Sequence, residues 1–470
     1  MPDKPNIIYI LSDQHRSDAM GCAGNKVIQT PSLDQLAANG VRFTRAHCQS
    51  PVCQPARASI ITGLYTQQHG ISRNDKEFDP AWPTMMKQLQ KAGYTTALFG
   101  KTHFHHPRSQ ATADGIWDMR QKEDFVRSFG YDYVMEEFDR YVHAFDQVRT
   151  HYTEYLKGKG VYEPYRDQIR SIFRLTPHHW DGVTSVLSHE DELSSFIADR
   201  AVDWLKSAQC QQPFFLSLNF VAPHVPLMDA PIWADYYKDA QIELGPNVPP
   251  EIPNQVWGEY MKSLQQHSNS HLLTDEYVLN GARHYYGSIS LFDQKIGEVL
   301  SLLDALDLAG NTWIVYSADH GEMLGDHNLM AKMSFYKPCV VVPAIIKPPA
   351  PMAGRVENGI VEAIDLTATI LDIAGAEPMP GSDAISLLSC LGGQGKTRDA
   401  AFSAISGMGG RYYFFSVHTG RFRYTMERNT GTPCELFDLV EDPLEMRNLV
   451  NDPGYARVVK EMAELLLPSL

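Results

Sequence analysis

Several patterns are missing from this chain, and each absence narrows what it can be. The seven cysteines include no CxxC pair, so neither a zinc site nor a disulfide framework is indicated. No apolar run reaches the ~18 residues of a membrane-spanning helix, and the N-terminus lacks the apolar segment of a secretory leader. No Asn-x-Ser/Thr sequon is present. We therefore expect a cytoplasmic protein with no membrane partner, or a periplasmic or secreted one if a leader has been removed.

An excess of basic residues is also missing. The formal net charge of −15 and the isoelectric point near 5.6 do not indicate a nucleic-acid-binding surface. A few inward-facing cations could still bind an anion beneath an acidic surface. The chain has 470 residues, 43% of them hydrophobic, which suits one large α/β domain with insertions or two domains sharing an interface. The oligomeric state is not indicated.

Strand patterns alternate with helical patterns over most of the chain. Four apolar runs, at residues 6–11, 95–99, 214–220 and 313–316, predict buried strands. Amphipathic helical patterns lie between them. This alternation predicts an α/β fold with a large, mostly parallel sheet flanked by helices on both faces.

The amino-acid composition and pattern change at two places along the chain. Residues 105–190 are dense in tyrosine, phenylalanine and acidic residues. They indicate an insertion whose aromatic rings either cover the flank of the core or shape a pocket for an organic substrate. From about residue 395, short strand patterns and a final helical pattern predict an antiparallel sheet with a helix. We therefore expect a site-bearing domain over 1–394 and a smaller C-terminal α+β subdomain over 395–470.

One short stretch joins a potential nucleophile to a helix start. Cys53 precedes Pro55, which fits the first helical turn because its missing N–H would be unpaired there. The helical pattern of residues 56–61 then places Cys53 at a helix N-terminus, where free N–H groups favour negative charge, and Arg57 follows one turn later. The stretch fits a nucleophile beside an anion site. A half-buried thiol at an ordinary loop-to-helix junction fits it equally well.

Oxygen and imidazole donors end two of the predicted strands. Asp13 and Gln14 follow the first strand, and Asp319 and His320 follow the fourth. Open α/β sheets bind ligands at the carboxyl ends of their strands. Two carboxylates, an amide oxygen and an imidazole suit Ca²⁺ or Mg²⁺ better than zinc. Each residue alone fits a surface loop, but all four beside Cys53 favour a metal site.

Cationic and titratable side chains form a second group at strand ends. Lys101 and His103 follow the second predicted strand, His224 follows the third, and Lys332 comes soon after the fourth. Each lysine alone is most simply a solvated side chain. Together they could bind the oxygens of a tetrahedral anion, stabilise charge in the transition state and protonate a leaving oxygen.

The sequence from Cys53 to Arg57 resembles the Cys-x-Pro-x-Arg signature of the type I, formylglycine-dependent sulfatases of the alkaline phosphatase superfamily. Several separated motifs extend this resemblance in the same order along the chain: Asp13-Gln14, Gly100-Lys101-Thr102-His103, Ala222-Pro223-His224, Asp319-His320-Gly321-Glu322, Lys332, Glu435-Leu436-Phe437-Asp438-Leu439 and Asp442-Pro443-Leu444-Glu445. The resemblance implies an alkaline-phosphatase-like fold and covers most of the chain, with 105–190 matching least.

The resemblance also implies a reaction. A separate formylglycine-generating, or sulfatase-maturating, enzyme would oxidise Cys53 to formylglycine, whose hydrate carries two hydroxyls. One hydroxyl, activated by a divalent metal, attacks sulfur and the alcohol leaves; the other then loses its proton and sulfate is expelled. The implied activity is hydrolysis of a sulfate ester, with a sulfated carbohydrate as one candidate substrate. The implied metal is Ca²⁺, with Mg²⁺ or Mn²⁺ as alternatives.

Residue roles follow from the same resemblance. Modified Cys53 completes the metal site. Arg57 and Lys101 hold this modified residue, and His103 assists breakdown of the intermediate. Lys332 and His224 bind the sulfate oxygens, and His224 is also a candidate acid for the leaving group. The remaining positions are the metal ligands Asp13, Gln14, Asp319 and His320, and Asn74 as a further contact to the anion.

One position departs from the commonest signature. Ala56 replaces a serine that belongs to the usual recognition sequence of the maturating enzyme, and some phosphonate monoester hydrolases carry alanine there. A phosphonate monoester or phosphodiester hydrolase is therefore the alternative activity. The motif from Gly100 to His103 follows the sulfatase pattern and favours sulfate. A non-catalytic anion-binding protein with unmodified Cys53 is the alternative outside enzymes.

Overall fold

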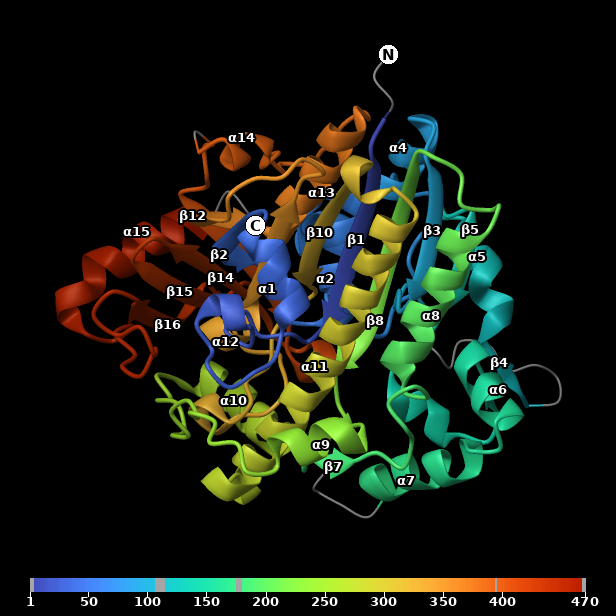
Figure 1. Ribbon diagram of the computed structural model, residues 1–470. Helices are drawn as coiled ribbons and strands as arrows, with labels where there is room; N and C mark the ends of the chain where they lie inside the picture. Colours follow the sequence, from blue (N-terminus) through green and yellow to red (C-terminus); the bar gives the residue numbers. More distant parts are fainter. Residues whose placement is uncertain (1–3, 106–114, 175–179, 394, 467–470) are drawn as a thin grey trace.

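The apolar run near the N-terminus forms a central strand of the large sheet in this computed structural model, which describes residues 4–105, 115–174, 180–393 and 395–466 (Figure 1). The sheet has eight strands in the order β12-β2-β11-β10-β1-β8-β3-β5. From one edge to the other these are β12 (Arg355–Glu362), β2 (Val41–His47), β11 (Val341–Lys347), β10 (Thr312–Ala318), β1 (Asn6–Asp13), β8 (Phe214–Pro223), β3 (Thr95–Gly100) and β5 (Tyr133–Glu136).

The central strands run parallel and are buried on both faces. Ile8 of β1 lies opposite Ile314 of β10 and Leu216 of β8. Ile8 belongs to the apolar cluster on one face of the sheet, and Tyr9 belongs to the cluster on the other. Burial on both faces explains why the sequence of β1 is apolar without alternation.

Helices cover both faces of the sheet. One face carries α1 (Pro31–Ala38), α8 (Leu193–Lys206) and the 31-residue α11 (Asp275–Ala305), seen in front of the strands in Figure 1. The other face carries α2 (Cys53–Thr62), α4 (Met85–Lys91) and α13 (Ala363–Ala374). The predicted fold class is confirmed.

A second sheet follows in the C-terminal part. Its four antiparallel strands are β13 (Ala400–Ser406), β14 (Tyr413–Thr419), β15 (Phe422–Glu427) and β16 (Thr432–Asp438), and α15 (Ala456–Leu466) packs on β14 and β15. The division into 1–394 and 395–470 stays a prediction.

Further helices and strands lie outside the main sheet and the face-covering helices. The helices are α3 (Thr66–His69), α5 (Glu123–Arg127), α6 (His151–Gly158), α7 (Tyr162–Arg174), α9 (Pro231–Tyr237), α10 (Gln255–Ser268), α12 (Lys337–Val340) and α14 (Leu388–Leu391). The strands are β4 (Trp117–Asp118), β6 (Val148–Arg149), β7 (Val183–Thr184) and β9 (Met228–Asp229). Within the described ranges, no helix combines the length and the apolarity needed to cross a membrane.

The predicted insertion contributes to the main sheet. Its strand β5 pairs with β3 in parallel, and the rings of Phe129, Tyr131 and Tyr152 are buried in the apolar clusters. These three rings therefore cover the flank of the core. Part of the segment, 106–114 and 175–179, lies outside the described residues. The limits of the insertion stay a prediction.

Candidate active site

The carboxyl ends of four parallel strands meet the start of one helix. Asp13 ends β1, Lys101 directly follows β3, His224 directly follows β8, and Asp319 directly follows β10. Cys53 is the first residue of α2, three residues earlier than the predicted helical run. The first turn of α2 tolerates Pro55 as its third residue, because that N–H has no partner inside the helix.

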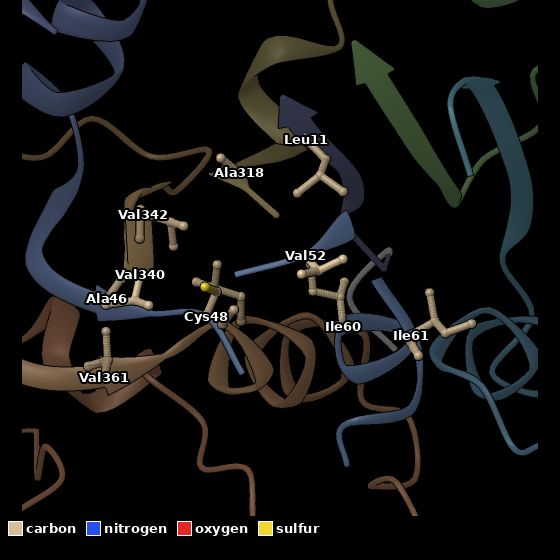
Figure 2. Packing of buried hydrophobic residues seen from close by; sticks show 14 of the residues in the cluster. Leu11, Ala46, Cys48, Val52, Ile60, Ile61, Ala318, Val340, Val342 and Val361 are labelled. Carbon is tan, nitrogen blue, oxygen red and sulfur yellow. The ribbon is translucent and has the colours of Figure 1, made fainter. Parts of the chain in front are cut away.

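Apolar packing fixes the position of α2 against the sheet. Figure 2 shows Ile60 and Ile61 of α2 with Val52 just before it, near Leu11 of β1 and Ala318 of β10. All five side chains are buried. A helix held this way can keep its first residue in register with the strand ends.

Four ligand-type side chains converge beside the helix start. One donor atom each from Asp13, Cys53, Asp319 and His320 lies within 4.8 Å of the other three. The Cys53 Sγ to His320 Nε2 distance is 3.2 Å, and the Asp319 Oδ1 to His320 Nε2 distance is 3.7 Å. His320 Nδ1 donates to the Gly321 carbonyl at 2.9 Å, so Nε2 is the nitrogen left with a lone pair for a metal.

Gln14 adds a fifth donor. Its side-chain NH₂ donates to Glu322, and its Oε1 is buried with no hydrogen-bond partner among the described residues. A buried amide oxygen without a donor is costly unless a cation or water satisfies it. The donor set of two carboxylates, an amide oxygen, an imidazole and residue 53 therefore fits a divalent cation that prefers oxygen.

Arg57 ties the two carboxylates together. Its Nε donates to Asp319 Oδ2 at 2.8 Å, and its Nη2 lies 3.0 Å from Asp13 Oδ2. Its Nη1 donates to the Lys101 carbonyl at 2.7 Å. The guanidinium is 2% exposed, so it is a fully buried counter-charge that lets like charges share one site.

Two lysines surround the Cys53 thiol with positive charge. Lys332 Nζ lies 2.8 Å from Cys53 Sγ, and Lys101 Nζ lies 2.6 Å from Asp13 Oδ2. Burial alone would raise the pKa of this thiol, but Lys332 and Lys101 outweigh it and bring the pKa well below its usual value. The site is therefore built to hold negative charge at residue 53.

The remaining predicted residues surround the same point. His103 is close enough to hydrogen-bond Cys53, and its Nδ1 is buried without a partner in the described part of the chain. Asn74 Oδ1 accepts from the Gln54 backbone N–H at 2.9 Å, at the first turn of α2. His224 Nδ1 donates to the Val225 carbonyl at 2.9 Å. All the predicted site residues thus lie around Cys53, and their roles stay predictions.

Two further carboxylates belong to this site and were not assigned to it from the sequence. Glu322 accepts from Gln14, and it lies in the same motif as Asp319, which is a signal that could have found it. Asp139 accepts from Lys101 Nζ and lies 3.6 Å from His224 Nδ1. It follows β5, a strand too short to stand out in the sequence.

Comparison with known proteins identifies the family. The sulfatase family model matches residues 5–376, and the model of the C-terminal part of N-sulphoglucosamine sulphohydrolase matches residues 325–469. The chain belongs to the sulfatase family. The predicted enzyme class, a sulfuric ester hydrolase, is confirmed with it.

Similar proteins span nearly the whole chain. An arylsulfatase of Clostridium perfringens is 26% identical over 99% of this chain and 94% of its own length. An N-acetylglucosamine-6-O-sulfatase of Bacteroides thetaiotaomicron is 25% identical over 98% of this chain and 86% of its own length. The structure of a phosphonate monoester hydrolase of Agrobacterium radiobacter superposes with a TM-score of 0.80 at 25% identity, over 99% of this chain and 95% of that one. The fold is thus shared by sulfatases and a phosphonate hydrolase.

Proposed function

We propose that this sulfatase releases inorganic sulfate from an organic sulfate ester, using a formylglycine made from Cys53. The observation that carries the proposal is the surroundings of Cys53 Sγ, with Lys332 Nζ at 2.8 Å and His320 Nε2 at 3.2 Å. A buried residue that contacts both a lysine and a ligand-type imidazole can serve as nucleophile and metal ligand together.

A divalent metal completes the proposed site. The metal would be held by Asp13, Gln14, Asp319 and His320. Residue 53 would be a further ligand once it is converted to formylglycine. The oxygen-rich donor set favours Ca²⁺, and Mg²⁺ or Mn²⁺ suit the same donors. When bound, such a cation supplies Lewis acidity for attack at sulfur.

The chain's own side chains divide the remaining tasks. Arg57 keeps Asp13 and Asp319 in place, and Lys101 pairs with the same Asp13 oxygen as Arg57 does. Lys332 would bind the sulfate oxygens.

Three more side chains would act on the substrate's groups. His224 donates its Nδ1–H to a backbone carbonyl, so when the ring is also protonated at Nε2, that second N–H is the one that can bind the sulfate or protonate the leaving oxygen. His103 lies beside residue 53 and can take a proton when sulfate departs. Asn74 would contact the anion through its side-chain NH₂, because its Oδ1 already accepts from Gln54.

A sulfated sugar is the organic part we favour. The N-acetylglucosamine-6-O-sulfatase named above supports this choice. The phosphonate monoester hydrolase of similar fold keeps a second activity open, and Ala56 fits it as well. Maturation by a formylglycine-generating enzyme and a cytoplasmic location are part of the proposal.

The first test removes the thiol that would become the aldehyde. Co-expressed with a maturating enzyme, Cys53→Ala should lose sulfate release from an aryl sulfate by ~10⁴-fold or more, because the nucleophile is gone. Cys48→Ala, at another buried cysteine outside the site, should keep its activity. Mass spectrometry of the wild-type peptide should show the mass change from thiol to aldehyde. Full activity of Cys53→Ala would rule the mechanism out.

A second measurement separates the two substrate classes. Aryl sulfate and aryl phosphonate esters with the same leaving group should be compared at equal metal concentration. We expect the higher kcat/KM for the sulfate ester, and the reverse order would assign the chain to phosphonate hydrolysis. Sulfated mono- and disaccharides can then be tested against small aryl and alkyl sulfates.

A further inference from the structure

A buried carboxylate lies against the cations of the anion pocket. Asp139 is 5% exposed, lies three residues after β5 and pairs with Lys101, which also pairs with Asp13. Its Oδ1 accepts from Lys101 Nζ and lies 3.6 Å from His224 Nδ1. Lys101, which pairs with Asp13 beside residue 53, and His224, which would bind the sulfate, therefore share one carboxylate.

Asp139 carries its negative charge in place. Burial alone would raise the pKa of its carboxyl, but Lys101 and His224 outweigh burial and hold the pKa below its usual value. Lys101 therefore has two ionised carboxylates as partners, Asp13 and Asp139. A pocket meant only to maximise anion binding would leave this lysine with a single partner, because the second carboxylate repels any anion that enters.

The repulsion has a use, because it depends on the charge of the ligand. A fixed charge interacts with a ligand in proportion to the ligand's own charge. A sulfate monoester carries one negative charge, whereas a phosphate monoester and inorganic sulfate carry close to two at neutral pH. One extra carboxylate therefore weakens binding of the doubly charged species about twice as much in free energy.

We propose that Asp139 is a specificity-determining residue that selects singly charged tetrahedral oxyanions over doubly charged ones. It favours the sulfate monoester over a phosphate monoester, and it favours departure of the inorganic sulfate product. The proposal rests on the proposed function of this site, since both use the pocket around Lys101 and His224.

The test compares two tetrahedral anions of different charge. Dissociation constants of sulfate, with two charges, and methanesulfonate, with one, are measured by calorimetry on the calcium-loaded protein. Asp139→Asn and Asp139→Ser remove the charge, and Asp139→Glu keeps it. Two charge-removing variants with side chains of different size are used, so that the test still works if one of them misfolds. Thermal unfolding shows whether each variant is folded.

A matched control comes from the same loop. Glu137 is buried two residues away, and burial raises the pKa of its carboxyl to about 8, so it is mostly neutral at pH 7. Glu137→Gln therefore removes almost no charge. It should leave the ratio of the two dissociation constants unchanged.

The expected result is a fixed relation between two fold-changes. Both charge-removing variants should bind methanesulfonate about 3–10-fold more tightly, and sulfate by about the square of that factor, ~10–100-fold. Asp139→Glu should keep the wild-type ratio. Equal changes for both anions, or no tightening of sulfate, would overturn the proposal and leave Asp139 as a purely structural partner of Lys101.

Turnover provides an independent reading. Asp139→Asn should raise the ratio of kcat/KM for an aryl phosphate to that for an aryl sulfate by ~10-fold. Calorimetry needs no turnover, so the charge relation can fail while the enzyme still releases sulfate, and it can hold while the enzyme is inactive. The two failures are therefore distinguishable.

Discussion

At the scale of single residues, Arg57 decides whether the metal site can exist without its metal. Asp13 and Asp319 are both fully buried, and each contributes a carboxylate oxygen to the same cluster of ligand atoms with Cys53 and His320. Without a counter-charge, two ionised carboxylates in a buried site would repel each other strongly. The guanidinium supplies that charge through a separate hydrogen bond to each carboxylate.

Replacing Arg57 by methionine should therefore destabilise the protein in a metal-dependent way. With a chelator present, the free energy of unfolding should fall by ~3–5 kcal/mol, because a buried charge pair loses one partner. With Ca²⁺ in excess, part of the loss should return, since the ion pairs the carboxylates and stabilises the folded state by mass action. Chemical denaturation with and without Ca²⁺ measures both values.

The control for this prediction is an exposed arginine. Arg127 pairs with Glu123 and Asp124 on the surface of α5, so Arg127→Met should change the free energy of unfolding by less than ~1 kcal/mol. If calcium stabilised wild type and Arg57→Met to the same extent, Arg57 would not be acting as the counter-charge of the metal site.

At the scale of elements, strand β3 delivers Lys101 to the site through a constrained turn. Gly100, its last residue, has φ +107°, a conformation that L side chains rarely adopt. A Cβ built there would lie 1.9 Å from the Asn219 carbonyl oxygen of β8. The backbones of β3 and β8 are thus too close for any side chain at this position.

Gly100→Ala should lower both stability and activity. We expect a loss of about 2–4 kcal/mol in the free energy of unfolding, from the positive φ and the clash together. Activity should fall further than stability explains, because relief of the clash moves Lys101. Gly93→Ala is the matched control, since Gly93 has φ +88° with open space around it and should show the φ cost alone. Equal losses in the two variants would show that the close approach to Asn219 is unimportant.

The same elements show how much of the fold can be predicted from sequence. The runs of β1, β3, β8 and β10 are recognisable because burial on both faces removes polar residues from them. The direction of β11 is not recognisable in this way. It runs antiparallel to β10 and β2 with an equally buried, apolar sequence.

Elements with mixed burial escape prediction. The first five residues of strand β12 alternate between half-buried and exposed at the sheet edge, and α10 is a largely polar helix that was not predicted from the sequence. Asp139 was missed for the related reason that it follows β5, a four-residue edge strand. Most of the other site residues follow long buried strands or lie in the first two turns of α2, so their motifs could be placed from the sequence, whereas Asn74 and Lys332 lie in loops.

At the scale of the whole molecule, a buried ion triad joins the C-terminal sheet to the active-site loop. Arg423 of β15 bonds Glu435 of β16 and Glu445, and all three side chains are nearly inaccessible. Glu445 also accepts from the Lys337 backbone N–H at 2.7 Å, at the start of α12 and five residues beyond Lys332. The family model that matches 325–469 likewise spans the loop and the sheet.

Breaking this triad should therefore affect both stability and substrate binding. Arg423→Met keeps the apolar length of the side chain between the Tyr336 and Phe437 rings but leaves two buried glutamates without their cation. We expect a loss of ~3–5 kcal/mol in the free energy of unfolding. The KM for an aryl sulfate should rise, because the backbone that follows Lys332 loses an anchor.

A compensating variant tests the physical reason for that loss. When Glu435→Gln and Glu445→Gln are added to Arg423→Met, the buried negative charges disappear together with the cation, and most of the lost stability should return. After Glu445→Gln, the amide oxygen of the new side chain can still accept from the Lys337 N–H, so KM should move back toward the wild-type value. If the triple variant were no more stable than Arg423→Met alone, packing rather than charge would join the C-terminal sheet to the loop that carries Lys332.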